Sequence, residues 1–258
     1  MGYWVVRKYI SGSVIERSKV YVPSSRRPRT GRVKGHTSAE KRDSNARGAA
    51  RTLARLLNCN FSCADFLLTI KYDDEHLPAT WQEQERDAGN FVRRLTRALK
   101  GQGAETVKSV IICSEMDGKT GEVVRKHGHI IISGTGFAFS GGKWKIGRRL
   151  LDDIWGKGSV YCESLWDQQD YTPLAVYLIK QTADHRDNRK KYRPSRNMDK
   201  PIVTEEIVKT GQELRAPKGA VIKERIYTEF GATNYLRYVK PDETRQAKQQ
   251  PTTERRNR

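Results

Sequence analysis

The sequence lacks any apolar stretch long enough to cross a membrane, and its first residues lack the basic-then-apolar order of a secretory signal. A transmembrane helix needs about 18 or more consecutive apolar residues, and no run approaches that length. We therefore expect a soluble protein with no membrane partner, which remains in the cytoplasm of the cell that makes it.

Cysteine is scarce, which argues against a disulfide-stabilised fold. Cys59, Cys63, Cys113 and Cys162 lie mostly within apolar stretches, where buried free thiols are the commoner interpretation. Cys59 and Cys63 have no second close cysteine pair to complete a zinc site, although two histidines farther along the chain could be recruited. A structural zinc is therefore not expected.

Acidic residues are few compared with basic ones. The 258 residues include 49 Lys and Arg but only 30 Asp and Glu, which gives a formal net charge of +19. A field of that sign attracts phosphate backbones or anionic membranes, and nucleic acid is the leading partner here. The length and the 36% hydrophobic content allow a buried core, in one domain with extensions or in two small domains, and we favour one domain.

The first 60 residues predict a hairpin, a basic arm and a helix. Residues 4–22 are rich in Val, Ile and Tyr on both sides of a Ser-Gly-Ser sequence, which is typical of a β-hairpin. Residues 24–35 are broken by Pro and Gly and predict a mobile arm that could grip phosphates. Thr37 or Ser38 then caps a helix that extends to about Leu57. The candidate phosphate contacts in the arm are Arg26, Arg27 and Arg29.

The central segment predicts an α+β domain. Apolar and β-branched runs indicate strands, and amphipathic periodicity indicates helices. The predicted elements in chain order are a strand at 66–72, a helix at 80–100, strands at 108–115 and 126–133 joined by a turn, a helix at 144–155, a strand at 159–165 and a helix at 172–182. This order predicts a split βαβ, ferredoxin-like antiparallel sheet with helices on one face, which leaves the other face free for substrate.

The remaining segments predict a loop, an extension and a tail. Residues 183–201 are dominated by charge, whereas residues 204–239 regain some strand-like texture and are assigned to the central domain. The last residues have no aromatic or aliphatic anchor, which predicts disorder. The expected division is residues 1–60 for the N-terminal hairpin, arm and helix, 61–240 for the main domain with a C-terminal extension, and 241–258 for a disordered tail.

The pair His127 and His129 is the first candidate for chemistry. Residues two apart on a strand share a face, so both imidazoles point the same way, as metal ligands do. Such a pair on a surface strand can also be incidental. Glu115 ends the neighbouring strand, and alternation with Cys113 and Ile111 could place its carboxylate beside the imidazoles if the strands pair, although it could equally be a solvent-exposed strand end. Two nitrogens and a carboxylate would hold a divalent cation and leave positions for phosphate oxygen and water.

Tyr177 is the second candidate, on the helix predicted to start at Thr172 and Pro173. Apolar residues form the buried stripe of this helix and leave Tyr177, Lys180 and Gln181 together on another face. A phenol with a pKa of about 10 is a poor nucleophile unless a positive charge stabilises the phenoxide, and Lys180 could supply that charge. The alternative is a tyrosine packed at the edge of the core beside a lysine whose stem covers apolar surface.

A strand glutamate, a His-x-His strand and a Tyr-x-x-Lys helix in a basic chain together resemble the HUH endonucleases, a superfamily of rolling-circle replication initiators and relaxases. The resemblance is greatest to single-tyrosine replication proteins of small circular single-stranded DNA phages and of related prophage or plasmid elements. It covers roughly residues 66–201. It implies that Glu115, His127 and His129 hold Mg²⁺ or Mn²⁺, that Tyr177 is the nucleophile and that Lys180 assists it.

The activity implied by the resemblance is metal-dependent, site-specific nicking and joining of single-stranded DNA at a replication origin, through a 5′-phosphotyrosine intermediate. The chain has no helicase module, so a host helicase and a DNA polymerase in the cytoplasm of a bacterial host are expected partners. Further candidate DNA contacts are Arg193 and Arg196. The alternatives are a plasmid relaxase or transposase of the same superfamily, or a non-catalytic nucleic-acid-binding module.

Two features depart from patterns seen in the family. The residue between the histidines is usually bulky and hydrophobic, but here it is Gly128, which leaves a gap for a neighbouring helix residue to fill or loosens the strand. Tyr177 also has no partner tyrosine four residues before or after it. Closing a circle would then need a second subunit, and hence an oligomer, or a second round with the same tyrosine.

Overall fold

The computed structural model describes residues 2–24, 39–134, 139–140, 143–144, 148–165, 169–182, 190–209, 211–227 and 233–241. The chain divides into two compact units, a central unit of residues 31–200 and a terminal unit of residues 1–30 and 201–258. Each unit contains a five-stranded antiparallel sheet, and the fold is α+β as expected. Among the described residues, no helix is both long and apolar enough to span a membrane.

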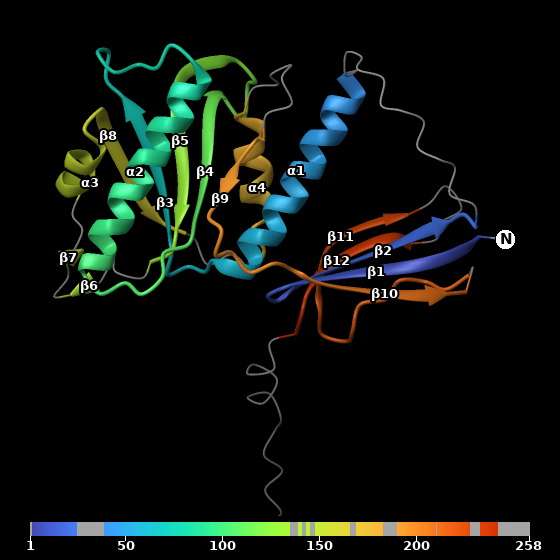
Figure 1. Ribbon diagram of the computed structural model, residues 1–258. Helices are drawn as coiled ribbons and strands as arrows, with labels where there is room; N and C mark the ends of the chain where they lie inside the picture. Colours follow the sequence, from blue (N-terminus) through green and yellow to red (C-terminus); the bar gives the residue numbers. More distant parts are fainter. Residues whose placement is uncertain are drawn as a thin grey trace, which may run out of the picture. The chain divides into compact units, whose positions relative to one another are not determined.

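The central unit contains the strands and helices expected of the main domain (Figure 1). Its sheet has the strand order β8-β3-β5-β4-β9. The strands are β3 (Phe66–Tyr72), β4 (Ser109–Met116), β5 (Val123–Ile132), β8 (Gly158–Ser164) and β9 (Arg193–Pro194). The helices are α1 (Ala39–Asn60), α2 (Trp81–Gly101), α3 (Arg148–Trp155) and α4 (Thr172–Lys180).

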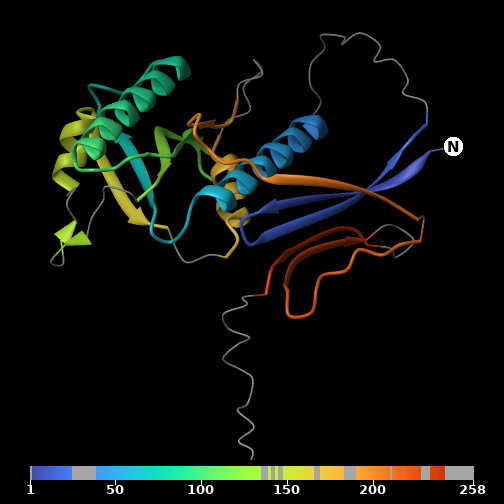
Figure 2. The same ribbon diagram turned by 60° about the horizontal axis from the view of Figure 1, so that its bottom comes forward.

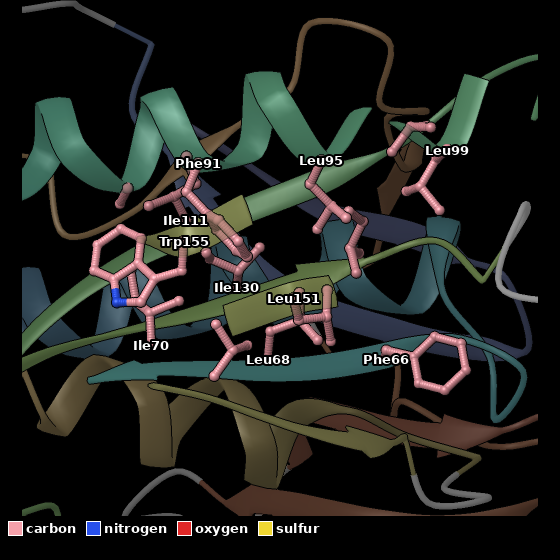
Figure 3. Close-up of a cluster of buried hydrophobic side chains, with 14 of the residues drawn as sticks. Phe66, Leu68, Ile70, Phe91, Leu95, Leu99, Ile111, Ile130, Leu151 and Trp155 are labelled. Atoms are coloured by element: carbon pink, nitrogen blue, oxygen red, sulfur yellow. The ribbon is translucent and has the colours of Figure 1, made fainter. Parts of the chain in front are cut away.

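Helices pack on both faces of this sheet, which corrects the expectation of helices on one face. Helices α2 and α3 pack on the face that carries Leu68, Ile70 and Ile130, in the cluster drawn in Figure 3. Helices α1 and α4 pack on the opposite face, in a second cluster that includes Leu67 and Ile131. Consecutive strand residues are apolar here, a pattern typical of strands that are buried on both faces.

Helix α2 shows how local sequence fixes an element. The side chain of Thr80 accepts a hydrogen bond from the backbone N–H of Glu83, and the Glu83 carboxylate accepts one from the backbone N–H of Thr80. This reciprocal capping box satisfies two backbone donors that the first turn leaves unpaired. Phe91, Leu95 and Leu99 recur at helical spacing and are fully buried against the sheet (Figure 3).

One predicted helix start is wrong. Trp144 was expected to begin a helix, but Lys143–Trp144 forms β7, which pairs with β6 (Phe139–Ser140) in a two-stranded sheet. Helix α3 begins at Arg148 instead. The helical pattern in the sequence extends back to Trp144. Trp144 instead pairs with Phe139 of β6, which excludes it from the helix.

The terminal unit is built by strands from the two ends of the chain. The predicted N-terminal hairpin is confirmed as β1 (Tyr3–Ser11) and β2 (Val14–Val22). It joins β10 (Ile202–Val208), β11 (Val221–Tyr227) and β12 (Thr233–Val239) in the order β10-β1-β2-β12-β11, which is visible in Figure 2. Long-range strand pairing of this kind carries no local sequence signal.

The domain division therefore differs from the one expected. Residues 204–239 do not extend the central domain but belong to the terminal unit, and α1 packs against α4 in the central unit rather than standing with the hairpin. A separate core forms around Val6, Ile15 and Leu236 in the terminal unit. The predicted basic arm at 24–35, from residue 25 onward, and the predicted tail at 241–258, from residue 242 onward, lie outside the described residues.

Candidate active site

The face of the central sheet that α1 and α4 cover changes from apolar to polar along its strands. Ile131 and Leu67 are buried at one end, and the same face continues to His129 and Thr69 and then to His127. His129 lies opposite both Thr69 of β3 and Ile112 of β4 in the strand register. Because α4 packs over β4 and ends beside this region, a polar site is formed where the apolar core stops.

The two histidines point the same way, as their spacing predicted. Their ring centroids lie 5.0 Å apart with an interplanar angle of 89°. The Nε2 atoms of His127 and His129 lie 3.2 Å and 3.0 Å from a single atom, the side-chain oxygen Oε1 of Gln181. Two imidazole nitrogens and one amide oxygen therefore converge on one point.

Gln181 caps the C-terminal end of α4, and its backbone fixes that end to the sheet. Its carbonyl oxygen accepts hydrogen bonds from the backbone N–H groups of Glu115 and Met116, at 3.2 Å and 3.1 Å. The side chain is buried, and its amide Nε2 has no hydrogen-bond partner among the described residues. The sequence placed Gln181 on the same helix face as Tyr177, but only the fold shows that it meets the histidines.

One tautomer of each histidine leaves an electron pair at this point. The Nδ1 atom of His127 lies 2.9 Å from the carbonyl oxygen of Arg125, and a carbonyl only accepts, so Nδ1 carries a proton, and a ring with this one proton presents a lone pair at Nε2. Burial lowers the pKa of His129 to about 4, with the charge of His127 as the second cause, so His129 is neutral at neutral pH. When His129 donates from Nδ1 to the hydroxyl of Thr69, 3.2 Å away, its Nε2 also presents a lone pair.

These donors fit a divalent cation. In the tautomers that carry their protons on Nδ1, the two Nε2 lone pairs and the Gln181 oxygen face one another, and a cation at their centre would offset their repulsion. Imidazole nitrogens suit first-row transition ions, and the amide oxygen suits harder ions, so Mn²⁺ matches the mixed set well. Mg²⁺ prefers oxygen ligands and matches it less well. His127, His129 and Gln181 are thus the residues that could hold a metal.

Glu115 does not join the histidines as expected. Ser114, not Glu115, lies opposite His127 in the register, and a β-bulge follows between Ser114 and Met116. Alternation places Glu115 on the side of Cys113, and its charge is one of the causes that raise the pKa of that thiol. Within the described residues, no three His, Cys, Asp or Glu side chains gather around a common point. The alternation of Glu115 with Cys113 and Ile111 holds, but the register pairs those two residues with Gly128 and Ile130, so their face is not the face of the histidines.

Tyr177 lies one helical turn before Gln181 on α4. Its side chain is 42% exposed, so the phenol is accessible. A Cβ atom added at Gly118, in the turn between β4 and β5, would lie 3.1 Å from both Cε2 of Tyr177 and Cγ of Gln181. The tyrosine ring and the glutamine stem therefore pack side by side against the same turn. Lys180 is also exposed, at the last position of α4.

The candidate arginines lie in different environments. Arg26, Arg27 and Arg29 lie outside the described residues. Arg193 is engaged with α2, since its guanidinium lies 3.4 Å from the carboxylate of Glu85 and donates to the Glu85 carbonyl at 3.3 Å. Arg196 is exposed. Arg193 is thus not brought to the histidines, because its strand neighbour Ile111 packs on the face covered by α2.

Gly128 leaves no gap between the histidines. A Cβ atom at this position would lie 2.9 Å from Cγ1 and 3.0 Å from Cδ1 of Ile70, which is fully buried. The space is therefore filled by a residue of the neighbouring strand β3, not by a helix residue as anticipated. Comparison with protein-family models, curated proteins and solved structures finds no match to this chain.

Proposed function

We propose that the protein is a single-tyrosine nuclease of the HUH type, which nicks and rejoins single-stranded DNA to initiate rolling-circle replication. The observation that carries the proposal is the meeting of His127, His129 and Gln181 at one point, at 3.0–3.2 Å, with the accessible phenol of Tyr177 one helical turn from Gln181. The proposed metal ligand Gln181 and the proposed nucleophile Tyr177 therefore both lie at the C-terminal end of α4. The net charge of +19 supports a nucleic-acid substrate.

The strand order supports the fold that this function requires. The elements β3, α2, β4, β5, α3 and β8 follow the chain order of a βαββαβ unit. The sheet order β8-β3-β5-β4 places the first and third strands of that unit in the middle, with β9 added at one edge. We propose a split βαβ, ferredoxin-like core, in which the His-x-His strand is central and its neighbours hold it in register.

The chemistry follows from the positions of these side chains. A divalent cation bound by His127, His129 and Gln181 would polarise a phosphate oxygen and offset the negative charge of the transition state. The phenolic oxygen of Tyr177 attacks phosphorus, so that the Tyr–O–P bond forms and the bond from phosphorus to the 3′ oxygen breaks. The phenol proton passes to solvent, and the leaving 3′ oxygen takes up a proton to become a hydroxyl. Attack by a 3′ hydroxyl on the phosphotyrosine reverses the step and joins the strand.

Lys180 assists this step as a charge. Its ammonium group, three residues after Tyr177 on the exposed side of α4, favours the phenoxide and the additional charge on phosphorus. The strand that bears the 3′ hydroxyl is then free for a polymerase to extend. The proposed setting is a replication origin in a bacterial cell, with a host helicase to separate the strands.

Covalent capture tests the proposal. Full-length protein is incubated with 5′-labelled and 3′-labelled single-stranded oligonucleotide pools and Mn²⁺, and products are separated in denaturing gels. We expect a protein–DNA adduct that carries the 3′ label, is abolished in Tyr177→Phe and in His129→Ala, and persists in the control Tyr227→Phe, an exposed tyrosine of the terminal unit. Reversible binding without any adduct would overturn the nuclease and leave a nucleic-acid-binding module.

A further inference from the structure

The polar face that carries the histidines continues past them to an edge strand. Tyr161 of β8 lies opposite Thr69 of β3, and Thr69 lies opposite His129 of β5. These three residues form a straight row across adjacent strands, and paired residues in such a row share a face. Two strand spacings of about 4.8 Å each separate the backbone of Tyr161 from that of His129 by roughly 10 Å.

Tyr161 presents its ring outward on this face. Its neighbours Val160 and Cys162 point to the other face, where they pack in the cluster with α2 and α3. Tyr161 is 53% exposed, whereas its neighbour Val160 is fully buried. Helices α1 and α4 pack over the apolar end of the face, around Leu67 and Ile131, whereas Tyr161 and Lys71 are exposed.

Charge is distributed unevenly around Tyr161. Lys71 of β3 is exposed, and it pairs with His127 of β5 and with Ser159 of β8. It lies two residues after Thr69 on the same strand, and therefore next to the row that contains Tyr161 on the same face. Glu163 lies in the other direction, opposite Leu67. Asp73, two residues beyond Lys71, is turned to His76, whose Nδ1 lies 2.7 Å from its carboxylate. A polyanion crossing this face is therefore attracted to the Lys71 side and repelled from the Glu163 side.

We propose that this β3–β8 surface, formed by Thr69, Lys71, Ser159 and Tyr161, binds a nucleotide next to the scissile phosphate. The base stacks on Tyr161, and its phosphate lies against Lys71. The inference rests on the proposed nuclease and specifies its substrate, because a tyrosine face accepts an unpaired base and not one within a duplex. An aromatic ring and a cation placed beside a polar site are the two elements with which proteins bind single strands without base-specific contacts.

The surface is tested by equilibrium binding, which needs no cleavage. Anisotropy of a labelled oligothymidylate is measured with full-length protein in EDTA. We expect Tyr161→Ala to weaken binding by about fivefold or more, Tyr161→Phe to retain it, and the matched control Tyr227→Ala to leave it unchanged. Lys71→Ala should weaken binding and reduce the slope of log K against log salt by about 0.7. Affinity for a blunt duplex should be unaffected by Tyr161→Ala.

The outcomes separate this inference from the proposed function. Equal single-strand affinity of Tyr161→Ala and the unsubstituted protein, with unchanged circular dichroism, overturns the surface even when the Tyr177 adduct forms. Absence of an adduct, with the Tyr161 and Lys71 effects intact, overturns the nuclease and supports the surface as a single-strand binding site. If Tyr161→Ala loses affinity for single strand and for duplex equally, the effect is a non-specific change in charge or structure, and this result also overturns the inference.

Discussion

The Nε2 atom of His129 and the side-chain oxygen of Gln181 lie 3.0 Å apart, and both residues are buried. The first belongs to a central strand, and the second lies 52 positions later, at the end of the helix that starts at Thr172. The contact is held from both sides, since the Gln181 carbonyl is bonded to β4 and the His129 Nδ1 atom faces Thr69. Hydrogen bonds from neighbouring strands therefore hold both residues whose atoms would bind a metal.

Substitution of Gln181 tests its role as a ligand. We expect Gln181→Ala to weaken Mn²⁺ binding by about tenfold or more. Losing a residue that only hydrogen-bonds to a metal ligand already weakens binding by about this factor, and losing a ligand should weaken it at least as much. Gln181→Glu should bind Mn²⁺ at least as tightly as the unsubstituted protein, because a carboxylate keeps the oxygen and adds charge. Titration followed by electron paramagnetic resonance of free Mn²⁺ measures both. The control Gln102→Ala, at the exposed C-cap of α2, should have no effect, and an unchanged affinity for Gln181→Ala would exclude the ligand role.

Gly118 lies close to Tyr177, the proposed nucleophile. A Cβ atom at 3.1 Å from both Tyr177 and Gln181 is closer than ordinary van der Waals contact, so Gly118→Ala should displace one of them. We expect adduct formation to slow by about tenfold or more, since small misplacements of reacting groups are costly. The helical Gly48→Ala, whose added Cβ meets nothing within 4 Å, should leave the rate unchanged. Equal single-turnover rates for the two variants would show that the turn does not position Tyr177.

Gly128 is required by its neighbour in the core. Gly128→Ala should lower the free energy of unfolding by about 1–3 kcal/mol, because the new methyl group overlaps the buried side chain of Ile70. In an Ile70→Ala background the same substitution should cost much less, since the overlapping Cγ1 and Cδ1 atoms are gone. A double-mutant cycle in urea unfolding measures the coupling. Additive losses would contradict direct contact.

Burial of His129 predicts a loss of stability in acid. Its pKa is lowered from 6.5 to about 4 in the folded protein, so between these values the unfolded chain binds more protons than the folded one. Stability should therefore fall as pH falls from 6.5 towards 4, by about 3 kcal/mol from this group. Urea unfolding in EDTA at several pH values checks this. His129→Gln should show a flatter profile over the same range, and parallel profiles would contradict a buried neutral histidine.

Local sequence determined the elements that depend on local interactions. The apolar periodicity of α2 and the β-branched runs of β3 and β5 were sufficient to predict these elements, to within a few residues at their ends, and the capping box at Thr80 explains why α2 begins there. The shared face of His127 and His129 follows from strand alternation alone and is confirmed by their common approach to Gln181. These predictions hold because each depends on bonds or spacings within a few residues.

Tertiary structure decided everything that joins distant segments. Pairing of β10 and β12 with the N-terminal hairpin moved residues 204–239 out of the central unit, and the register of β4 with β5 placed Ser114 rather than Glu115 beside His127. A shift of one residue in register reverses which face a side chain occupies, and no local pattern fixes that shift. The docking of the α4 end on β4 brought Gln181 to the histidines for the same reason, since a contact across 52 positions forms only when both elements are packed.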